Sequence, residues 1–152
     1  MKHWLFKSEP DEFSIDDLAS QPRKTDHWDG VRNYQARNYM GDEMRVGDHA
    51  FFYHSNCKEP GIVGIVRSSR EAYPDHTAFD PQDKHFDPKS DPDNPRWLLV
   101  DVAYQRKLHR PITLKELKEH PGLDEFRLTK RGNRLSIFPV SEDHWNLILS
   151  LE

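Results

Sequence analysis

The sequence contains a single cysteine, Cys57, which excludes an intramolecular disulfide and a zinc site built from several cysteines. Long apolar runs are missing too, because no stretch approaches the roughly 18 consecutive apolar residues of a membrane-spanning helix. The first ten residues lack the apolar core of a secretory signal. We therefore expect a soluble, monomeric intracellular protein, cytoplasmic or, in a eukaryote, nuclear.

The usual enzyme signatures are also absent, including glycine-rich nucleotide loops, a GxSxG elbow, an HExxH pair and an EF-hand loop. His54 stands three residues before Cys57, but a catalytic thiol needs a base within hydrogen-bond reach and an oxyanion site. Proximity in a turn supplies neither. The loop residues that could ligate a metal match no closed zinc or calcium site; these are His76, Asp80, Asp83, His85 and Asp87. We expect no catalysis, no metal and no cofactor.

The chain does contain enough apolar material for a packed core, together with unevenly distributed charge. Of its 152 residues, 35% are hydrophobic and 11% aromatic, which suits one domain over residues 1–152. The formal net charge is −4, and segment 75–93 alone carries six aspartates against two lysines. Segment 106–134 instead carries nine basic residues against four acidic ones. Nucleic acid therefore remains a possible partner, because a local basic face can meet phosphate.

Hydrophobic patterning predicts strands over residues 3–8, 49–55, 61–67, 97–104 and 135–140. Ser14, Thr113 and Ser141 stand where helix N-caps are expected, and a further helix is predicted over 34–44. Residues 26–33 are interpreted as a loop, and the proline-rich residues 74–95 as a long surface excursion. Because strands and helices do not alternate, we predict an α+β fold: a curved, mostly antiparallel β-barrel decorated with short helices.

Three polar clusters are candidates for a binding site. The first places Trp28 in a polar loop with Gly30, followed by Asn33 and two arginines. An aromatic ring beside directional hydrogen-bonding groups suits a flat, polar heterocycle such as an unstacked base. The others are residues 53–56, where a strand leaves the sheet, and residues 7–10. The structural alternatives are a tryptophan plug at one end of the barrel, a hydrogen-bonded turn and a surface ion pair.

The same clusters, with other motifs spread over almost the whole chain, resemble the EVE domain family. The segments that carry the resemblance are 7–12 (KSEPDE), 28–38 (WDGVRNYQARN), 52–56 (FYHSN), 60–61 (PG), 70–75 (REAYPD), 86–89 (FDPK) and 94–97 (NPRW). The resemblance implies a PUA-like fold and a pocket for a modified or flipped nucleobase. Matched residue by residue, that pocket would draw on Lys7, Ser8, Trp28, Val31, Asn33, Tyr53, His54 and Ser55.

Within this implied pocket, we expect Trp28 to stack on the base while Asn33 and Ser55 read its polar edge. Lys7 would favour a nearby phosphate, as would Arg32, Arg37, Lys130, Arg131 and Arg134. The expected function is a non-catalytic module that binds DNA or RNA through a modified base. Two alternatives remain open: an enzyme that processes a nucleotide or heterocycle with His54 or Cys57, and a protein-interaction module that uses loop 75–95.

Overall fold

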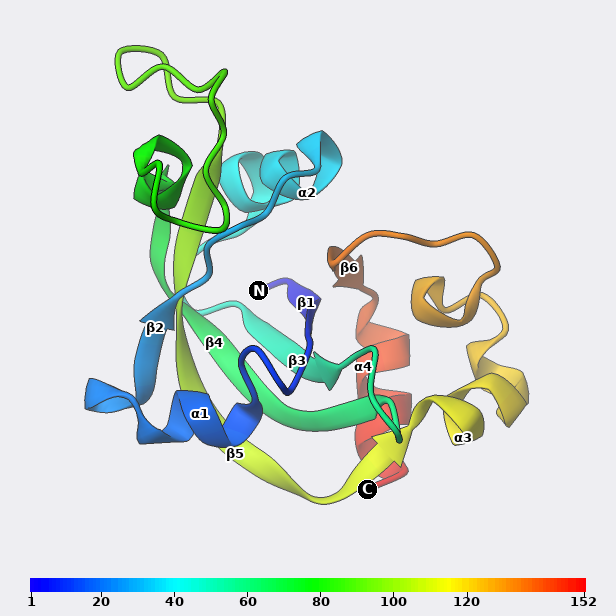
Figure 1. The fold of residues 1–152 in the computed structure, drawn as a ribbon. Helices are drawn as coiled ribbons and strands as arrows, with labels where there is room; N and C mark the ends of the chain where they lie inside the picture. Colours follow the sequence, from blue (N-terminus) through cyan, green and yellow to red (C-terminus); the bar gives the residue numbers. More distant parts are fainter.

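A computed structural model describes all 152 residues, and its centre is a curved six-stranded sheet (Figure 1). The strands are β1 (His3–Ser8), β2 (Thr25–His27), β3 (His49–His54), β4 (Gly61–Pro74), β5 (Leu98–Thr113) and β6 (Ile137–Val140). Their order is β2-β5-β4-β3-β1-β6, in which β1 and β3 run parallel and all other neighbours run antiparallel. The predicted α+β class is thus confirmed.

Short helices connect and cover the strands. They are α1 (Ile15–Ser20), α2 (Tyr34–Asn38), α3 (Leu114–Glu119) and α4 (Glu142–Ser150), with the π-helical turn η2 (Tyr39–Glu43) and the 3-10 turns η1 (Pro22–Lys24), η3 (His76–Phe79), η4 (Pro121–Leu123) and η5 (Arg127–Thr129). Ser14, Thr113 and Ser141 each accept a backbone hydrogen bond as the N-cap of α1, α3 and α4, which confirms the predicted helix starts. None of the helices has the length and apolar stretch needed to span a bilayer.

The predicted barrel is corrected by the structure, because the sheet curves but does not close. β2 and β6 are its two edges. β2 has only three residues, and β6 contains Pro139, which cannot donate to a ladder, so neither edge offers a long partner for closure. The curvature accompanies register shifts in the β3–β4 and β4–β5 pairs, since bulges bend and twist the strands that contain them.

Three further segments differ from their predicted conformations. Residues 25–27, at the start of the predicted loop, pair with β5, and their polar, half-buried side chains gave no alternating signal. The predicted helix over 34–44 contains α2 only as far as Asn38 and then widens into the π-helical turn η2. β5 continues to Thr113, well beyond residue 104, because its pairing with β4 carries polar residues into the ladder.

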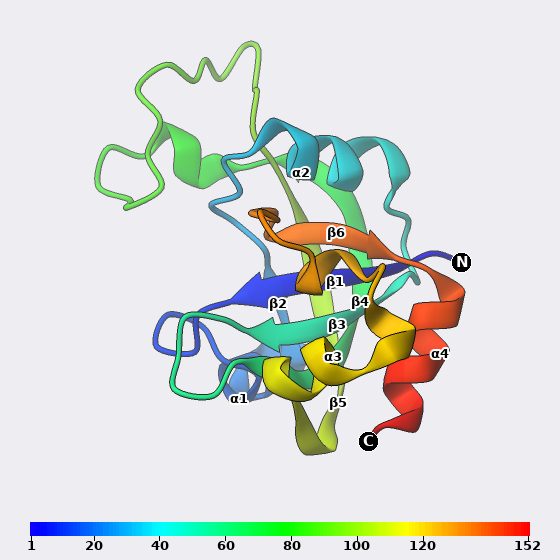
Figure 2. The same ribbon diagram turned by 90° about the vertical axis from the view of Figure 1, so that its right-hand side faces the viewer.

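Side-chain alternation along the central strands creates a hydrophobic core on each face of the sheet. Trp4, Phe6 and Phe52 pack on one face with residues of α1 and α2. Leu5 and Phe51 pack on the opposite face with residues of α3 and α4, the helices in front of the sheet in Figure 2. The first core ends at the loop after β2, where Trp28 lies between the apolar interior and the open surface.

Candidate functional site

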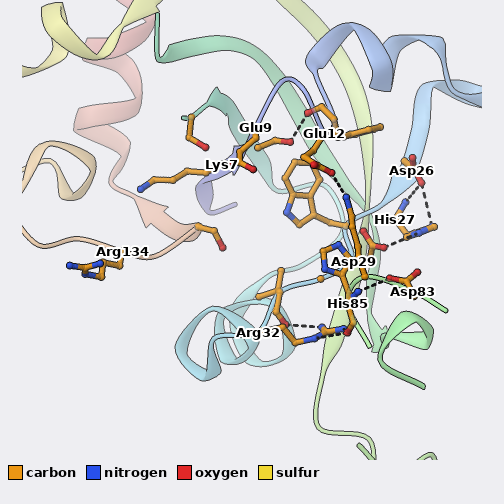
Figure 3. Close-up of a pocket in the computed structure, with 18 of the residues that line it drawn as sticks. Lys7, Glu9, Glu12, Asp26, His27, Asp29, Arg32, Asp83, His85 and Arg134 are labelled. Carbon is orange, nitrogen blue, oxygen red and sulfur yellow. Dashed lines mark hydrogen bonds and ion pairs between the residues drawn. The ribbon is translucent and has the colours of Figure 1, made fainter. Parts of the chain in front are cut away.

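A pocket of about 840 Å³ opens where β1, the loop after β2 and the segment 82–85 meet (Figure 3). Its volume falls within the range of small-molecule sites, about 300–1,000 Å³. Only three of its 19 lining residues are hydrophobic: Phe13, Trp28 and Val31. The pocket is therefore a polar hollow with one aromatic wall.

Trp28 forms the aromatic wall, although only 8% of its surface is exposed. Its backbone N–H donates to Val100 O at 2.7 Å, which anchors the residue to β5. Phe6 and Phe52 approach its ring edge-on, with centroid distances of 5.1 and 5.5 Å. The indole N–H donates to no acceptor in the protein. It is also accessible, because the only fully buried polar side-chain atoms without a partner are Ser68 Oγ and Asn133 Nδ2. This N–H can therefore donate to a molecule in the pocket.

The loop that carries Trp28 is held by close contact with the acidic excursion. Gly30 has φ of +78°, and a Cβ there would lie 2.5 Å from Cε1 of His85, so only glycine allows this approach. Its N–H donates to Asp75 Oδ2 at 2.9 Å. The segment 82–85 thereby becomes a wall of the pocket, whereas the sequence had predicted an open surface excursion.

Asp75 is the buried centre of this connection, with no exposed surface. Burial alone would raise the pKa of its carboxyl. Hydrogen bonds from Thr77, Gly30 and Arg32 outweigh that effect and hold the pKa below its ordinary value. Asp75 is therefore ionised at neutral pH and ties two segments of the chain together through fixed donors.

Arg32 extends the same network to the far wall. Its Nη1 donates to Asp75 Oδ2 at 3.0 Å, and its Nη2 donates to the backbone oxygen of His85 at 2.6 Å. The guanidinium also lies 5.6 Å from the ring of Trp97. Arg32 lines the pocket, but most of its donors are used within the protein.

Opposite charges occupy opposite sides of the pocket. Figure 3 shows Lys7 and Arg134 on one side and Asp26, Asp29 and Asp83 on the other. Lys7 forms no ion pair, and burial lowers the pKa of its ammonium. We call the side with Lys7 and Arg134 the cationic end, although Glu9 lies beside Lys7, and the side with the three aspartates, which Arg32 also lines, the acidic end.

An exposed ion pair between Lys84 and Glu12 bridges the rim. It joins the excursion to the connection between β1 and α1, and both of its residues line the pocket. Both side chains are more than half exposed, so the pair contributes little to stability, about 0–1 kcal/mol. The rim on this side is consequently held by a weak contact.

The structure brings together part of the predicted site. The predicted base-pocket residues that line the hollow are Lys7, Ser8, Trp28, Val31 and Ser55, and the predicted phosphate contacts that line it are Arg32 and Arg134. The ones that do not line it are Asn33, Tyr53, His54, Arg37, Lys130 and Arg131. The hollow thus lies beside part of the predicted set, and several of the remaining predicted residues are neighbours in sequence of residues that line it.

Three of these outlying residues have structural contacts instead. Asn33 is the N-cap of α2, and its Oδ1 accepts from Ala36 N at 3.0 Å. Tyr53 lies in the second core, where burial raises the pKa of its phenol to about 12. His54 Nε2 accepts from Ile15 N at 3.1 Å, and burial lowers the pKa of its imidazole, which favours the neutral form that can accept.

The outlying cations lie on the surface. Arg37 donates to Arg96 O at 3.1 Å and lies 4.7 Å from the ring of Tyr34. Lys130 pairs with Glu125 at 2.8 Å, and Arg131 is exposed. No three acidic, cysteine or histidine side chains come together as a group that could hold a metal ion.

Several lining residues were not predicted from the sequence. The excursion contributes Gln82, Asp83, Lys84 and His85, and the loop around Trp28 contributes Asp26, His27 and Asp29. One signal for the excursion was available, because the family-like segments 70–75 and 86–89 flank it on both sides. A solvated loop needs no such specific pattern, whereas a pocket wall does.

Comparisons with known proteins show the family and the fold. Residues 2–151 match the EVE domain. Thymocyte nuclear protein 1 of Gallus gallus is 49% identical over 167 residues, which cover 99% of this chain and 68% of that protein. Two crystal structures are also similar. A protein from Pseudomonas putida has a TM-score of 0.93, with 49% identity and 98% of each chain covered.

The second structure is the human THYN1 protein in complex with 5-methylcytosine containing DNA. Its TM-score is 0.95 and its identity 47%, with 99% of this chain and 97% of that chain covered. Both the sequence and the fold are therefore shared over nearly the whole length. This chain belongs to the EVE domain family.

Proposed function

We propose that this protein is a non-catalytic reader of a modified base in DNA, which it holds against Trp28. The observation that carries the proposal is an indole that borders a polar hollow large enough for a nucleotide, with an N–H that has no acceptor in the protein. Stacking on an aromatic ring contributes about 1–3 kcal/mol per base. The DNA complex of the human relative supports a base of the 5-methylcytosine type.

In this arrangement the base enters the hollow after leaving its stack, which costs a few kcal/mol in a duplex and less in a single strand. The backbone of the strand then runs along the basic segment 127–134, where Lys130 and Arg131 follow the phosphates. Carboxylates on the opposite side of the pocket repel the backbone and accept from an exocyclic amino group. Lys7 and Ser55 face the base from the cationic end.

The other functions suggested by the sequence have less support. His54 is occupied at the start of α1, and neither it nor Cys57 lines the pocket, so the two residues on which the enzyme alternative depended do not lie beside the proposed ligand. The acidic excursion packs through Arg32 and Asp75 as part of the pocket, so the segment 82–85 has a place in the proposed site, whereas no contact in the structure indicates a protein partner for the loop.

A titration with matched oligonucleotides tests the proposal. The set contains one cytosine, the same base methylated, or an abasic position, and fluorescence anisotropy reports the affinity. Trp28→Leu keeps an apolar side chain but removes stacking, so we expect affinity for the methylated strand to fall by about tenfold. Tyr34→Leu is the control, because Tyr34 is an exposed aromatic residue outside the pocket. Equal affinity for all three strands, unaffected by Trp28→Leu, would contradict the proposal.

A further inference from the structure

The cationic end of the pocket has the composition of an anion site. We propose that Lys7, Arg134, Ser55 and Ser136 bind a terminal phosphate monoester, so that the pocket accepts a nucleotide with a free phosphate. The ligand is a free mononucleotide or the phosphorylated end of a strand, which share this chemistry. The inference rests on the proposed function for the base and adds a separate site for the phosphate.

Backbone hydrogen bonds bring these residues together from three parts of the chain. Lys7 N donates to Ser136 O at 2.8 Å, which joins β1 to the segment before β6. Ser55 N donates to Ser8 O at 2.9 Å, which joins the end of β3 to the end of β1. Lys7 therefore stands on a strand, and Ser55 and Ser136 stand on main chain hydrogen-bonded to that strand, which favours a preformed site, while Arg134 follows two residues before Ser136 on the surface.

Neither cation has an anionic partner within the protein, and the only contact of the Lys7 ammonium is with the face of the Phe138 ring, 6.0 Å from its centre. Lys7 and Arg134 take part in none of the ion pairs of the structure. Ser55 and Ser136 line the pocket. Their hydroxyls are not among the fully buried polar atoms that lack a hydrogen-bond partner. Glu9 also lines the pocket, but its carboxylate accepts from Asn56 Nδ2 at 2.6 Å. An anion would supply the missing partner to both cations and both hydroxyls.

The charge of the site indicates which anion fits. A phosphate monoester carries about −1.5 to −2 at pH 7, close to the summed charge of Lys7 and Arg134. A phosphodiester inside a strand carries about half of that charge and balances only one cation. The half-buried position of Lys7 strengthens the interaction, because charge-assisted hydrogen bonds gain where water is partly excluded. Asp26, Asp29 and Asp83 exclude phosphate from the other end, which sets the orientation of the nucleotide.

Calorimetric titration of the full chain with three small ligands tests this inference. The ligands are 5-methyldeoxycytidine, which has no phosphate, its 5′-monophosphate, and the methyl ester of that monophosphate, a diester that carries one negative charge. We expect the monophosphate to bind about tenfold more tightly than its methyl ester. Inorganic phosphate alone should compete with the monophosphate. Equal affinity for the monophosphate and its methyl ester would overturn the inference.

Substitutions test whether the cationic end of the pocket causes the preference for the monophosphate over its methyl ester. Lys7→Ala and Arg134→Ala should each remove most of the difference between monophosphate and methyl ester, and Lys7→Arg should preserve it. Lys107→Ala is the control, because Lys107 is an exposed cation that pairs with Asp16 away from the pocket. If the difference persists in both alanine variants, the phosphate lies elsewhere and the assignment is wrong.

The outcomes separate this inference from the proposed function. Oligonucleotide binding that depends on methylation and on Trp28, combined with equal monophosphate and ester affinities, would overturn the phosphate site alone. A monophosphate preference that depends on Lys7 and Arg134 but on neither methylation nor Trp28 would support the phosphate site and overturn the base reader.

Discussion

Two tryptophans of similar burial, Trp28 and Trp145, have opposite roles in this fold. Their exposed fractions are 8% and 6%. Trp145 stacks on Phe51 at 3.9 Å and on His3 at 4.4 Å, with nearly parallel ring planes, so rings cover its surface. The neighbours of Trp28 meet it edge-on, with interplanar angles of 76° and 87° for Phe6 and Phe52, and a pocket opens beside it. Trp145 thus closes the second core, whereas Trp28, at nearly the same burial, borders the pocket.

Of the substitutions that test this comparison, replacing Trp145 should lower the free energy of unfolding the most. Trp145→Ala leaves a cavity between α4 and the sheet, and we expect the free energy of unfolding to fall by about 3–5 kcal/mol. Binding of a methylated oligonucleotide by the folded fraction should not change. Urea denaturation combined with anisotropy at low temperature measures both quantities. A selective loss of base preference would show that the second core also supports the site.

Asp75→Asn should lower the free energy of unfolding somewhat less. It weakens the contacts that hold the pocket wall beside Trp28. The variant removes the buried carboxylate that faces the half-buried guanidinium of Arg32, and we expect a loss of about 3 kcal/mol in unfolding free energy. Because the folded pKa of Asp75 is lowered, the stabilisation is present above pH 4 and is lost as the pH falls through the lowered value.

Urea denaturation at neutral and acidic pH measures this contribution. The difference between wild type and Asp75→Asn should shrink as the carboxyl becomes protonated. A difference that stays constant down to the lowest pH at which the protein folds would contradict the assigned charge.

Removing the ion pair between Lys84 and Glu12 should change the free energy of unfolding the least. Lys84→Gln removes the only hydrogen bond or ion pair between the excursion and the connection from β1 to α1, and unfolding free energy should change by less than about 1 kcal/mol. Amide hydrogen exchange in residues 82–85 should nevertheless become faster, because the wall opens locally more often. The matched control is Lys107→Gln, which breaks a similarly exposed pair with Asp16 and should leave that segment unchanged. Equal exchange rates in both variants would show that the pair does not restrain the wall.

Much of this architecture was predictable because it depends on local rules. Alternation in residues 3–8 and 49–55 specified two buried faces, and the capping patterns at Ser14 and Thr113 specified helix starts within a residue. The polar loop around Trp28 likewise marked an aromatic residue that a simple core would not require.

The predictions that failed depend on contacts between distant parts of the chain. Barrel closure requires two edge strands to meet, and no local pattern reports whether they do. The excursion was interpreted as solvated because it is acidic and rich in proline. Its role as a wall follows from Arg32 and Gly30, which contact residues more than 40 positions away.

The sequence by itself determined which segments become strands and helices, which side chains enter each core, and which family the chain resembles, because hydrophobic periodicity and capping act between near neighbours. Only the tertiary structure decided that the sheet stays open, that residues 82–85 line the pocket, and that unpaired cations gather opposite its carboxylates. Those features depend on where chain segments meet in space, and the buried Asp75 that fixes one such meeting looks in the sequence like any other aspartate of an acidic loop.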